Sequence, residues 1–448
     1  MKKKTYLKEL ERHKAIKEKQ MSSQEIYVSI ELGEKTHKIG KLWFHQRGAR
    51  QSASFEYDPD WLKHSEKFAL DPALQLTSGA FHTTPDQILF GAIGDSAPDR
   101  WGRVLMRRAE SVRAKSIGEA ARTLSEVDYL LGVNDEARQG ALRFSLKEGG
   151  PYLTPKDKES IPPLIDLPRL LSATEHYLND EETAEDLKIL LAPGSSLGGA
   201  RPKASVRDKD GHLAIAKFPK KDDEFNVVVW EAVALTLAEK AGIKTTDWRL
   251  ETIMDKPVLI LRRFDRHEGQ RVPFLSAMSM LGAKDNDPHS YLEITYAITQ
   301  HGANPNSDLE ELWRRIIFTV LISNTDDHLR NHGFLYERHK GWRLSPAYDV
   351  NPTPVEMKGR MLSTSIDYDD PTASIDLALS VIDEFRIKKA RALEIIKEVA
   401  LAVSEWRSVA TQFGLTKREI DRMASAFEHE NSKKLESNLH RNQIPIKK

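Results

Sequence analysis

The sequence predicts an α+β protein built from several packed units, and three observations lead to this prediction. The chain has 448 residues, more than one ordinary hydrophobic core organises. Its first part alternates apolar and polar residues as strands do, whereas the pattern from about residue 276 onward is mainly helical. Hydrophobic residues make up 40% and charged residues 30%, which is typical of a soluble globular protein.

Composition excludes several kinds of site and partner. Lysine plus arginine and aspartate plus glutamate both total 67, so bulk charge gives no reason to expect nucleic-acid binding. The absence of cysteine excludes disulfides, thiolate metal sites and cysteine nucleophiles. No apolar run reaches the roughly 18 residues that span a bilayer, and no apolar segment follows the basic start as in a secretory signal. We therefore expect a cytoplasmic protein with no membrane partner.

Residues 1–22 are expected to form a basic helical extension. Eight lysines and arginines stand there against three glutamates, with few apolar positions. This composition favours a solvated extension, and a contact surface for nucleic acid or a protein partner is the alternative.

Residues 23–150 are predicted to form a first, small subdomain. Alternating residues over 26–45 predict a β-hairpin, and 52–57 predict a third strand. A helical stretch over 96–132 is expected to begin at Pro98, because proline suits the first turn of a helix.

Residues 151–275 are predicted to form the nucleotide-binding part of the next lobe, after a linker rich in proline, glycine and charge at 146–164. Turns at 208–211 and 255–257 predict two strand pairs, and the apolar face of 225–241 predicts a helix between them. The remaining residues, 276–448, are expected to form a mainly helical lobe.

Asp326 and Asn331 lie five positions apart after a predicted helix at 308–323. Protein kinases use this spacing, with the aspartate deprotonating the acceptor hydroxyl and the asparagine holding a metal ion. A polar turn that caps the helix is the alternative for this pattern alone. A predicted hairpin over 333–344 then leads to Asp349, in the place of the kinase Mg²⁺-binding aspartate. Two protein oxygens suffice, because Mg²⁺ takes its other ligands from phosphates and water.

Lys217 and Glu231 lie upstream of these residues and complete the order of functional residues found in kinases. Lys217 ends an alternating strand and Glu231 follows on the next helix, an arrangement that fixes a lysine against nucleotide phosphates. The alternatives are that Lys217 is an exposed lysine at a strand end and that Glu231 lies on a solvated helix face. The glycine-rich segment 194–203 could cradle phosphates with its N–H groups. Ala200 and Arg201 replace the Lys and Ser/Thr of a Walker A loop, so a P-loop NTPase is not expected.

Several separated motifs, in order, resemble the HipA family of bacterial toxin kinases, and the resemblance runs through about 26–440. These motifs are FEYDPDWL at 55–62, GDSAPDRWGR at 94–103, SLGGARPK at 196–203, RFDR at 263–266, NTDDHLRN at 324–331 and LSPAYD at 344–349. The resemblance implies a bilobal protein-kinase-like fold, with a small N-terminal α/β subdomain and a mostly helical C-terminal lobe.

The resemblance also implies roles for individual residues of an ATP- and Mg²⁺-dependent Ser/Thr protein kinase. Asp326 would be the catalytic base, and Asn331 and Asp349 the Mg²⁺ ligands. Phe264 would contact the adenine, and His328 would lie beside the nucleotide. The alternative for His328 is a loop histidine whose hydrogen bonds are satisfied by the backbone. The residues expected to contact or position ATP are Ser196, Gly198, Gly199, Lys203, Lys217, Glu231, Arg262, Phe264 and His328.

Regulation and partners are also implied by the resemblance. Family members phosphorylate a serine of the glycine-rich loop and are inactivated by it; Ser196 matches that position and Ser195 lies beside it. Their usual partner is a small helix-turn-helix antitoxin like HipB, so DNA would be contacted only through the antitoxin. Their best-known substrates are aminoacyl-tRNA synthetases. Asp327 departs from the family pattern, and only the spacing to Asn331 favours Asp326 over it.

Two alternative functions remain at this point. A small-molecule kinase of the same fold would use the same ATP-binding residues. A non-catalytic corepressor that docks on a DNA-bound antitoxin is the other alternative, and the intact set of Lys, Asp, Asn and Asp argues against it.

Overall fold

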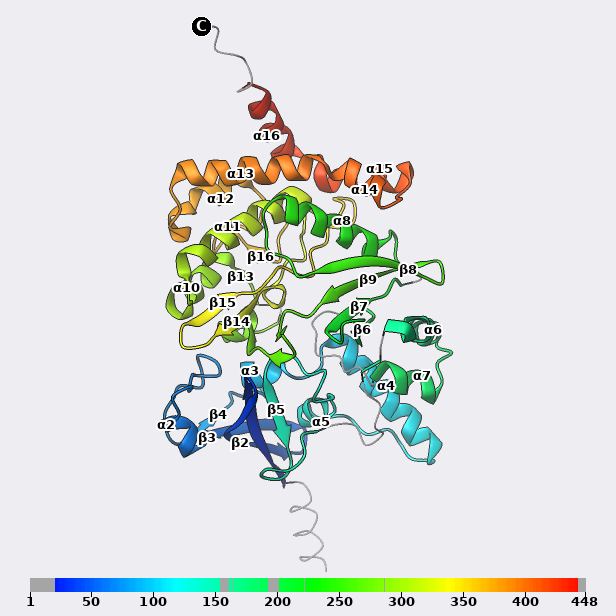
Figure 1. Ribbon diagram of the computed structural model, residues 1–448, viewed down its shortest axis with the longest axis vertical. Helices are drawn as coiled ribbons and strands as arrows, with labels where there is room; N and C mark the ends of the chain where they lie inside the picture. Colours follow the sequence, from blue (N-terminus) through cyan, green and yellow to red (C-terminus); the bar gives the residue numbers. More distant parts are fainter. Residues whose placement is uncertain are drawn as a thin grey trace, which may run out of the picture.

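The computed structural model consists of three parts, and the N-terminal part contacts both of the others. The structure describes residues 21–153, 161–162, 164–191, 201–220, 222–285 and 287–441. Figure 1 shows the N-terminal sheet toward one end, the helices α13 to α16 toward the other, and the four-stranded sheet between them. The mixture of helices and strands confirms the predicted α+β class.

The N-terminal part is a five-stranded antiparallel sheet of order β4-β3-β2-β1-β5. Its strands are β1 (Met21–Leu32), β2 (Lys35–Arg47), β3 (Arg50–Tyr57), β4 (Ala80–His82) and β5 (Leu142–Ser145). The predicted hairpin and third strand are confirmed. Met21 and Ser22 belong to β1 rather than to the predicted helical extension, and residues 1–20 lie outside the described residues.

Helices accompany this sheet, and the helical stretch predicted over 96–132 contains two separate helices, because residues 117–125 are not helical. The helices are α2 (Pro59–Lys63), α3 (Gly91–Asp95), α4 (Arg100–Ser116) and α5 (Glu126–Leu131). Asp99 caps α4 by accepting a hydrogen bond of 2.8 Å from Gly102 N, so Pro98 precedes the cap. Ser125 starts α5 with a capping box. The helical stretch is therefore divided where α4 ends at Ser116, just before Gly118 at a positive φ, and Ser125 begins a new helix.

The middle part is an antiparallel sheet of order β6-β7-β9-β8, and it confirms the two predicted strand pairs. Its elements are α6 (Leu167–Leu178), α7 (Ala184–Leu191), β6 (Lys203–Arg207), β7 (Leu213–Lys217), α8 (Val227–Lys240), β8 (Trp248–Ile253) and β9 (Lys256–Arg262). The second turn is Met254–Asp255, both at positive φ, one residue before the predicted turn. Trp101 and Leu105 of α4 pack into the core of this part, which joins it to the N-terminal part.

The C-terminal part is built around α11, most of whose residues are buried. This long helix confirms the helix predicted at 308–323. The helices are α9 (Ala277–Met280), α10 (Tyr291–His301), α11 (Pro305–Ile322), α12 (Ile375–Ser380), α13 (Lys389–Ser404), α14 (Trp406–Gln412), α15 (Lys417–Phe427) and α16 (Glu430–Arg441). Among the described residues, no helix is both long enough and apolar enough to cross a bilayer.

Short strands position the loops of this part. They are β10 (Arg266–His267), β11 (Gln270–Arg271), β12 (Phe274–Ser276), β13 (His289–Ser290), β14 (Gly333–Glu337), β15 (Gly341–Leu344) and β16 (Thr364–Ser365). The β14–β15 pair is the hairpin predicted at 333–344, and β12 joins it as a third strand.

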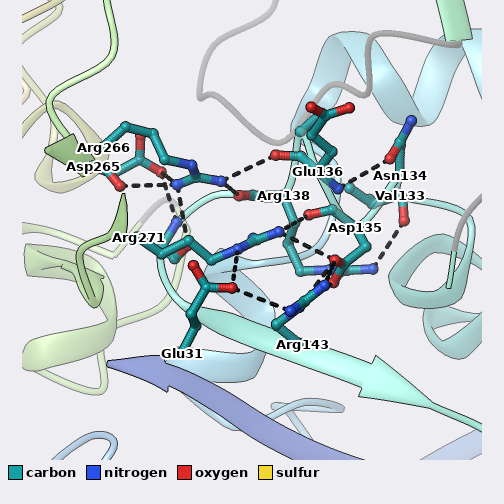
Figure 2. Close-up of polar contacts among 12 residues, drawn as sticks. Glu31, Val133, Asn134, Asp135, Glu136, Arg138, Arg143, Asp265, Arg266 and Arg271 are labelled. Carbon is teal, nitrogen blue, oxygen red and sulfur yellow. Dashed lines mark hydrogen bonds and ion pairs between the residues drawn. The ribbon is translucent and has the colours of Figure 1, made fainter. Parts of the chain in front are cut away.

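A buried set of arginines fixes the N-terminal part to the rest of the molecule (Figure 2). Asp265 accepts hydrogen bonds from Arg263, Arg266 and Gly140 N. Burial would raise the pKa of Asp265, but the two guanidinium groups hold it well below its usual range. We call this set the arginine network; its members are Glu31, Asp135, Arg143, Arg263, Asp265, Arg266 and Arg271.

Candidate active site

The loop after α11 carries the predicted base on its outer side. Ser323 ends the helix in the left-handed conformation and donates to the Ala426 carbonyl at 2.8 Å. The loop turns tightly, since His328 N donates to the Asp326 carbonyl at 2.9 Å. The Asp326 side chain is 75% exposed. Its carboxylate can therefore meet a group that arrives from solvent.

Asp327, the neighbouring acid, faces the interior. It accepts hydrogen bonds from Tyr291 Oη at 2.5 Å and Thr319 Oγ1 at 3.4 Å, and His332 Nε2 lies 3.1 Å from its Oδ1. Burial would raise the pKa of Asp327, but His332 and Tyr291 lower it below the usual value. Asp327 thus holds the loop against α10 and α11, while Asp326 projects outward.

Asn331 is tied to the same loop. Its Nδ2 donates to the Asp326 carbonyl at 3.2 Å, and its backbone N–H donates to His328 O at 2.8 Å. Tyr348 Oη donates to the Arg330 carbonyl at 2.7 Å. The residue before Asp349 is thereby bonded to the residue before Asn331, which links the two predicted metal ligands.

Lys217 lies between two acids. Its Nζ is 2.5 Å from Glu231 Oε1 and also contacts the Asp349 carboxylate. Asp349 is held at a φ of +55°, in the left-handed region. The structure therefore brings together the strand lysine, the helix glutamate and the hairpin aspartate that the sequence placed in order.

Lys203 joins this group through a residue that sequence reasoning missed. Its Nζ forms an ion pair of 3.0 Å with Asp99, the cap of α4, and both side chains are buried. Trp101 Nε1 donates to the Lys203 carbonyl at 3.1 Å. Asp99 and Trp101 stand in the motif at 94–103, but no local pattern pairs them with a strand more than a hundred residues later. We call Asp99, Lys203, Lys217, Glu231 and Asp349 the lysine cluster.

Burial and charge shift the pKa values of this cluster in opposite directions. Burial would raise the pKa of Asp349, but Lys217 and Lys203 hold it below its ordinary value. Burial raises the pKa of Glu231 by more than Lys217 lowers it, and Asp349 adds to the rise. Acids with opposite shifts beside shared cations are typical of functional sites.

The donor set fits a hard cation such as Mg²⁺. Asp349 keeps its charge at neutral pH because its pKa is lowered, and Asn331 offers a carboxamide oxygen. Within the described ranges, no group of three or more His, Cys, Asp or Glu residues could hold a metal ion. A cation here would need further ligands from phosphates or water.

The residues expected around the adenine have different surroundings. The Phe264 ring is 5.5 Å from the Tyr348 ring, which places it beside the residue before Asp349. The Arg262 guanidinium reaches Asp247 at 3.4 Å, and its backbone N–H donates to Asp247 O at 2.8 Å. His328 Nδ1 is buried and has no hydrogen-bond partner among the described residues.

The glycine-rich loop lies largely outside the described residues. Ser195, Ser196, Gly198 and Gly199 fall in the undescribed range 192–200. At its described end, Arg201 forms a two-pronged ion pair with Asp223 at 2.8 and 2.9 Å.

Two family models match the chain. The HipA-like C-terminal domain matches residues 195–407, and the HipA N-terminal domain matches residues 33–125. The chain belongs to the HipA family. The two matched ranges include the lysine cluster, the Asp326 loop and most of the N-terminal part.

Known proteins resemble this HipA-family chain over different lengths. A Haemophilus influenzae protein named as a candidate kinase is 26% identical over 195 residues, which cover 38% of this chain and 57% of that protein. The Sinorhizobium fredii protein Y4mE, named likewise, is 24% identical over 185 residues, covering 35% of this chain and 42% of that protein. The chain thus aligns with about half the length of these relatives.

The fold is shared with a HipA of known structure. The Shewanella oneidensis HipA, solved with HipB and its operator DNA, matches with a TM-score of 0.63 and 18% identity. The match covers 92% of this chain and 97% of that one. It confirms the HipA-type, kinase-like fold that the motifs implied.

Proposed function

We propose that this HipA-family protein is an ATP- and Mg²⁺-dependent Ser/Thr protein kinase. The observation that carries the proposal is Lys217, which contacts both Glu231 and Asp349. In kinases a lysine held by a helix glutamate binds the nucleotide phosphates, beside the aspartate that binds the metal ion.

Each residue has a defined part in the proposed reaction. Lys217 and Lys203 orient the phosphates, and Glu231 holds Lys217. Mg²⁺, bound by Asn331 and Asp349, would neutralise charge on the phosphates. Asp326 accepts the proton of the acceptor hydroxyl. Most of the rate increase would come from positioning and electrostatics, since phosphoryl transfer needs little covalent help.

The exposure of Asp326 favours a protein acceptor over a small molecule. Its carboxylate is 75% exposed and stands at the surface of its loop. A serine or threonine on a protein segment could reach such a base, whereas sites for small molecules enclose most of the ligand.

The toxin role is the wider part of the proposal. As in other HipA proteins, we propose a cytoplasmic location, a HipB-like antitoxin as partner, and contact with DNA only through it. A translation component such as an aminoacyl-tRNA synthetase is the proposed substrate. The Shewanella HipA, whose fold this chain shares, was solved with HipB and operator DNA. We also propose inactivation by autophosphorylation at Ser196 or Ser195, since a phosphate there would repel the ATP phosphates.

The replacement Asp326→Asn tests the mechanism. It should lower phosphate transfer about 100-fold or more, because general-base catalysis and acceptor alignment are both lost. The assay is transfer from labelled ATP to proteins of a bacterial lysate, with intact-mass analysis of the enzyme. Asp369→Asn, at an exposed acid, is the control and should keep normal activity.

Growth of cells that express each variant tests the toxin role separately. Asp326→Asn should abolish growth arrest together with phosphate transfer. Arrest that survives this replacement would contradict a kinase mechanism. Transfer to small molecules alone, with no labelled protein, would instead favour a small-molecule kinase.

A further inference from the structure

Lys358 brings a cation to the proposed catalytic base. Its Nζ lies 3.7 Å from Asp326 Oδ1 and donates to the Thr325 carbonyl at 2.9 Å. Ser363 Oγ accepts a further bond from this ammonium at 3.4 Å. The amine therefore stands beside Asp326 while the backbone of the previous residue holds it.

The segment that carries Lys358 is fixed to the same loop. Ser363 donates to the Thr325 carbonyl through both N–H and Oγ, at 3.2 and 2.9 Å. Arg360 Nη2 donates to the Val320 carbonyl at 3.0 Å and anchors the segment to α11. Lys358 N donates to Pro354 O at 3.2 Å within a tight turn. These bonds hold the lysine at Asp326 even though it lies 32 positions later in the chain.

Stability does not explain this contact. The Lys358 side chain is 44% exposed and that of Asp326 is 75% exposed, and such pairs contribute little to folding. The chemistry of the site gives a better reason. The reaction brings an anionic phosphoryl group toward an anionic base, and a cation between them lowers the cost.

We propose that Lys358 is a further catalytic residue, which contacts the transferred phosphoryl group and acts on the chemical step rather than on ATP binding. The inference rests on the proposed kinase function. In the step, the acceptor O–H bond breaks and its proton goes to Asp326. The acceptor oxygen forms a bond to the γ-phosphorus, and the bond from that phosphorus to the bridging oxygen breaks, its electron pair leaving with ADP. Lys358 offsets the charge on the transferring oxygens.

Lys358 and Lys217 therefore have separate tasks. Lys217 is buried between Glu231 and Asp349 and would hold ATP before the reaction. Lys358 stands on the acceptor side, next to Asp326. A lysine suits this place because its single ammonium on a flexible stem can move from the Thr325 carbonyl to a phosphoryl oxygen.

The test compares Lys358→Met, Lys358→Arg and a control, Lys340→Met, which removes an exposed lysine paired with Glu337 on the β14–β15 hairpin. The full chain is assayed for autophosphorylation and for phosphate transfer to casein with Mg-ATP, and ATP binding is measured by calorimetry. Lys358→Met should lower kcat about 10- to 100-fold and leave the Kd for ATP within about twofold. Lys358→Arg should recover most of kcat, and Lys340→Met should match the wild type.

The outcomes separate this inference from the proposed function. Wild-type transfer that Asp326→Asn abolishes, with normal kcat for Lys358→Met, would overturn the role of Lys358 alone. A lowered melting temperature with equal losses in kcat and ATP affinity would assign Lys358 a structural role and also overturn it. Absence of any transfer by the wild type would overturn both.

Discussion

The arginine network and the lysine cluster are two buried sets of charges that differ in how their cations are held. In the arginine network, guanidinium groups bond both to acids and to backbone carbonyls, as Arg266 does with Asp265 and with Arg138 O at 2.7 Å. In the lysine cluster, Lys217 shares one ammonium between Glu231 and Asp349. An arginine guanidinium is a rigid group with five N–H donors and can fix several loops at once. A lysine ammonium is a compact charge on a flexible stem and can exchange its partners.

This difference in how the cations are held suggests that the arginine network stabilises the fold, whereas the lysine cluster is suited to binding a ligand. Asp265 is surrounded by donors from two parts of the molecule, and its partners are all satisfied within the fold. In the lysine cluster, two lysines face three acids, which leaves an excess of negative charge that a bound cation would offset. Mutations in the first set should therefore alter folding, and mutations in the second should alter activity.

The largest effect is expected for Asp265→Asn. The replacement leaves Arg263 and Arg266 buried without their shared counter-ion, which should cost about 3 to 5 kcal/mol in the free energy of unfolding. Urea unfolding at pH 7 measures this loss. Asp247→Asn, which removes an exposed partner of Arg262, is the control and should have little effect. Equal losses in the two variants would contradict the stabilising role given to the arginine network.

The pH dependence of that loss has a definite sign. The pKa of Asp265 is lowered by folding, so its stabilisation is present above the ordinary pKa of 3.8 and is lost as the pH falls below it. The difference between wild type and Asp265→Asn should therefore narrow below about pH 4. If the difference in free energy of unfolding between the two proteins widened in acid, the lowered pKa of Asp265 would be contradicted.

A smaller effect, on activity rather than folding, is expected for Glu231→Gln. Glutamine can still accept a hydrogen bond from Lys217, and Asp349 still balances the lysine charge, so unfolding should change little. Phosphate transfer should fall about 10- to 100-fold, because Lys217 loses the helix carboxylate that positions it and keeps only Asp349 as an acidic partner. Initial rates with labelled ATP, beside urea unfolding, measure both quantities.

Glu231 also gives the opposite pH trend to Asp265. Folding raises the pKa of Glu231, so its contribution to stability is lost as the pH rises above the ordinary value of 4.5. The glutamine variant should therefore gain stability relative to the wild type as the pH rises. A variant that unfolds like Asp265→Asn, with normal transfer, would reverse the roles given to the two sets.

Sequence patterns predicted the parts of the fold and site that depend on local order. Alternation predicted the β1–β2 hairpin, and the order of strand and helix anticipated that Lys217 and Glu231 meet. The break in the helical stretch at 96–132 was missed: α4 ends at Ser116, Gly118 follows at a positive φ, and Ser125 caps a separate helix.

Contacts between distant residues could not be predicted in this way. Spacing alone favoured Asp326 over Asp327, and the physical difference between them comes from Tyr291 and Thr319 on separate helices. The pairing of Asp99 with Lys203 and the approach of Lys358 to Asp326 likewise have no local signal, because tertiary packing creates them.

The smallest effect is expected for Arg143→Lys, at the partly exposed edge of the arginine network. This replacement tests whether the guanidinium geometry matters in addition to the charge. Arg143 donates to Asp135 at 2.6 Å and to Glu31 at 3.1 Å, and its guanidinium lies 3.8 Å from the centre of the Tyr152 ring. Lysine keeps the charge but cannot make all of these contacts, and Arg143 is 22% exposed, so water replaces part of what is lost. Urea unfolding should show a loss of about 1 kcal/mol with unchanged phosphate transfer. No loss at all would mean that the charge of residue 143, rather than the arginine fork, is what stabilises its contacts with Asp135 and Glu31.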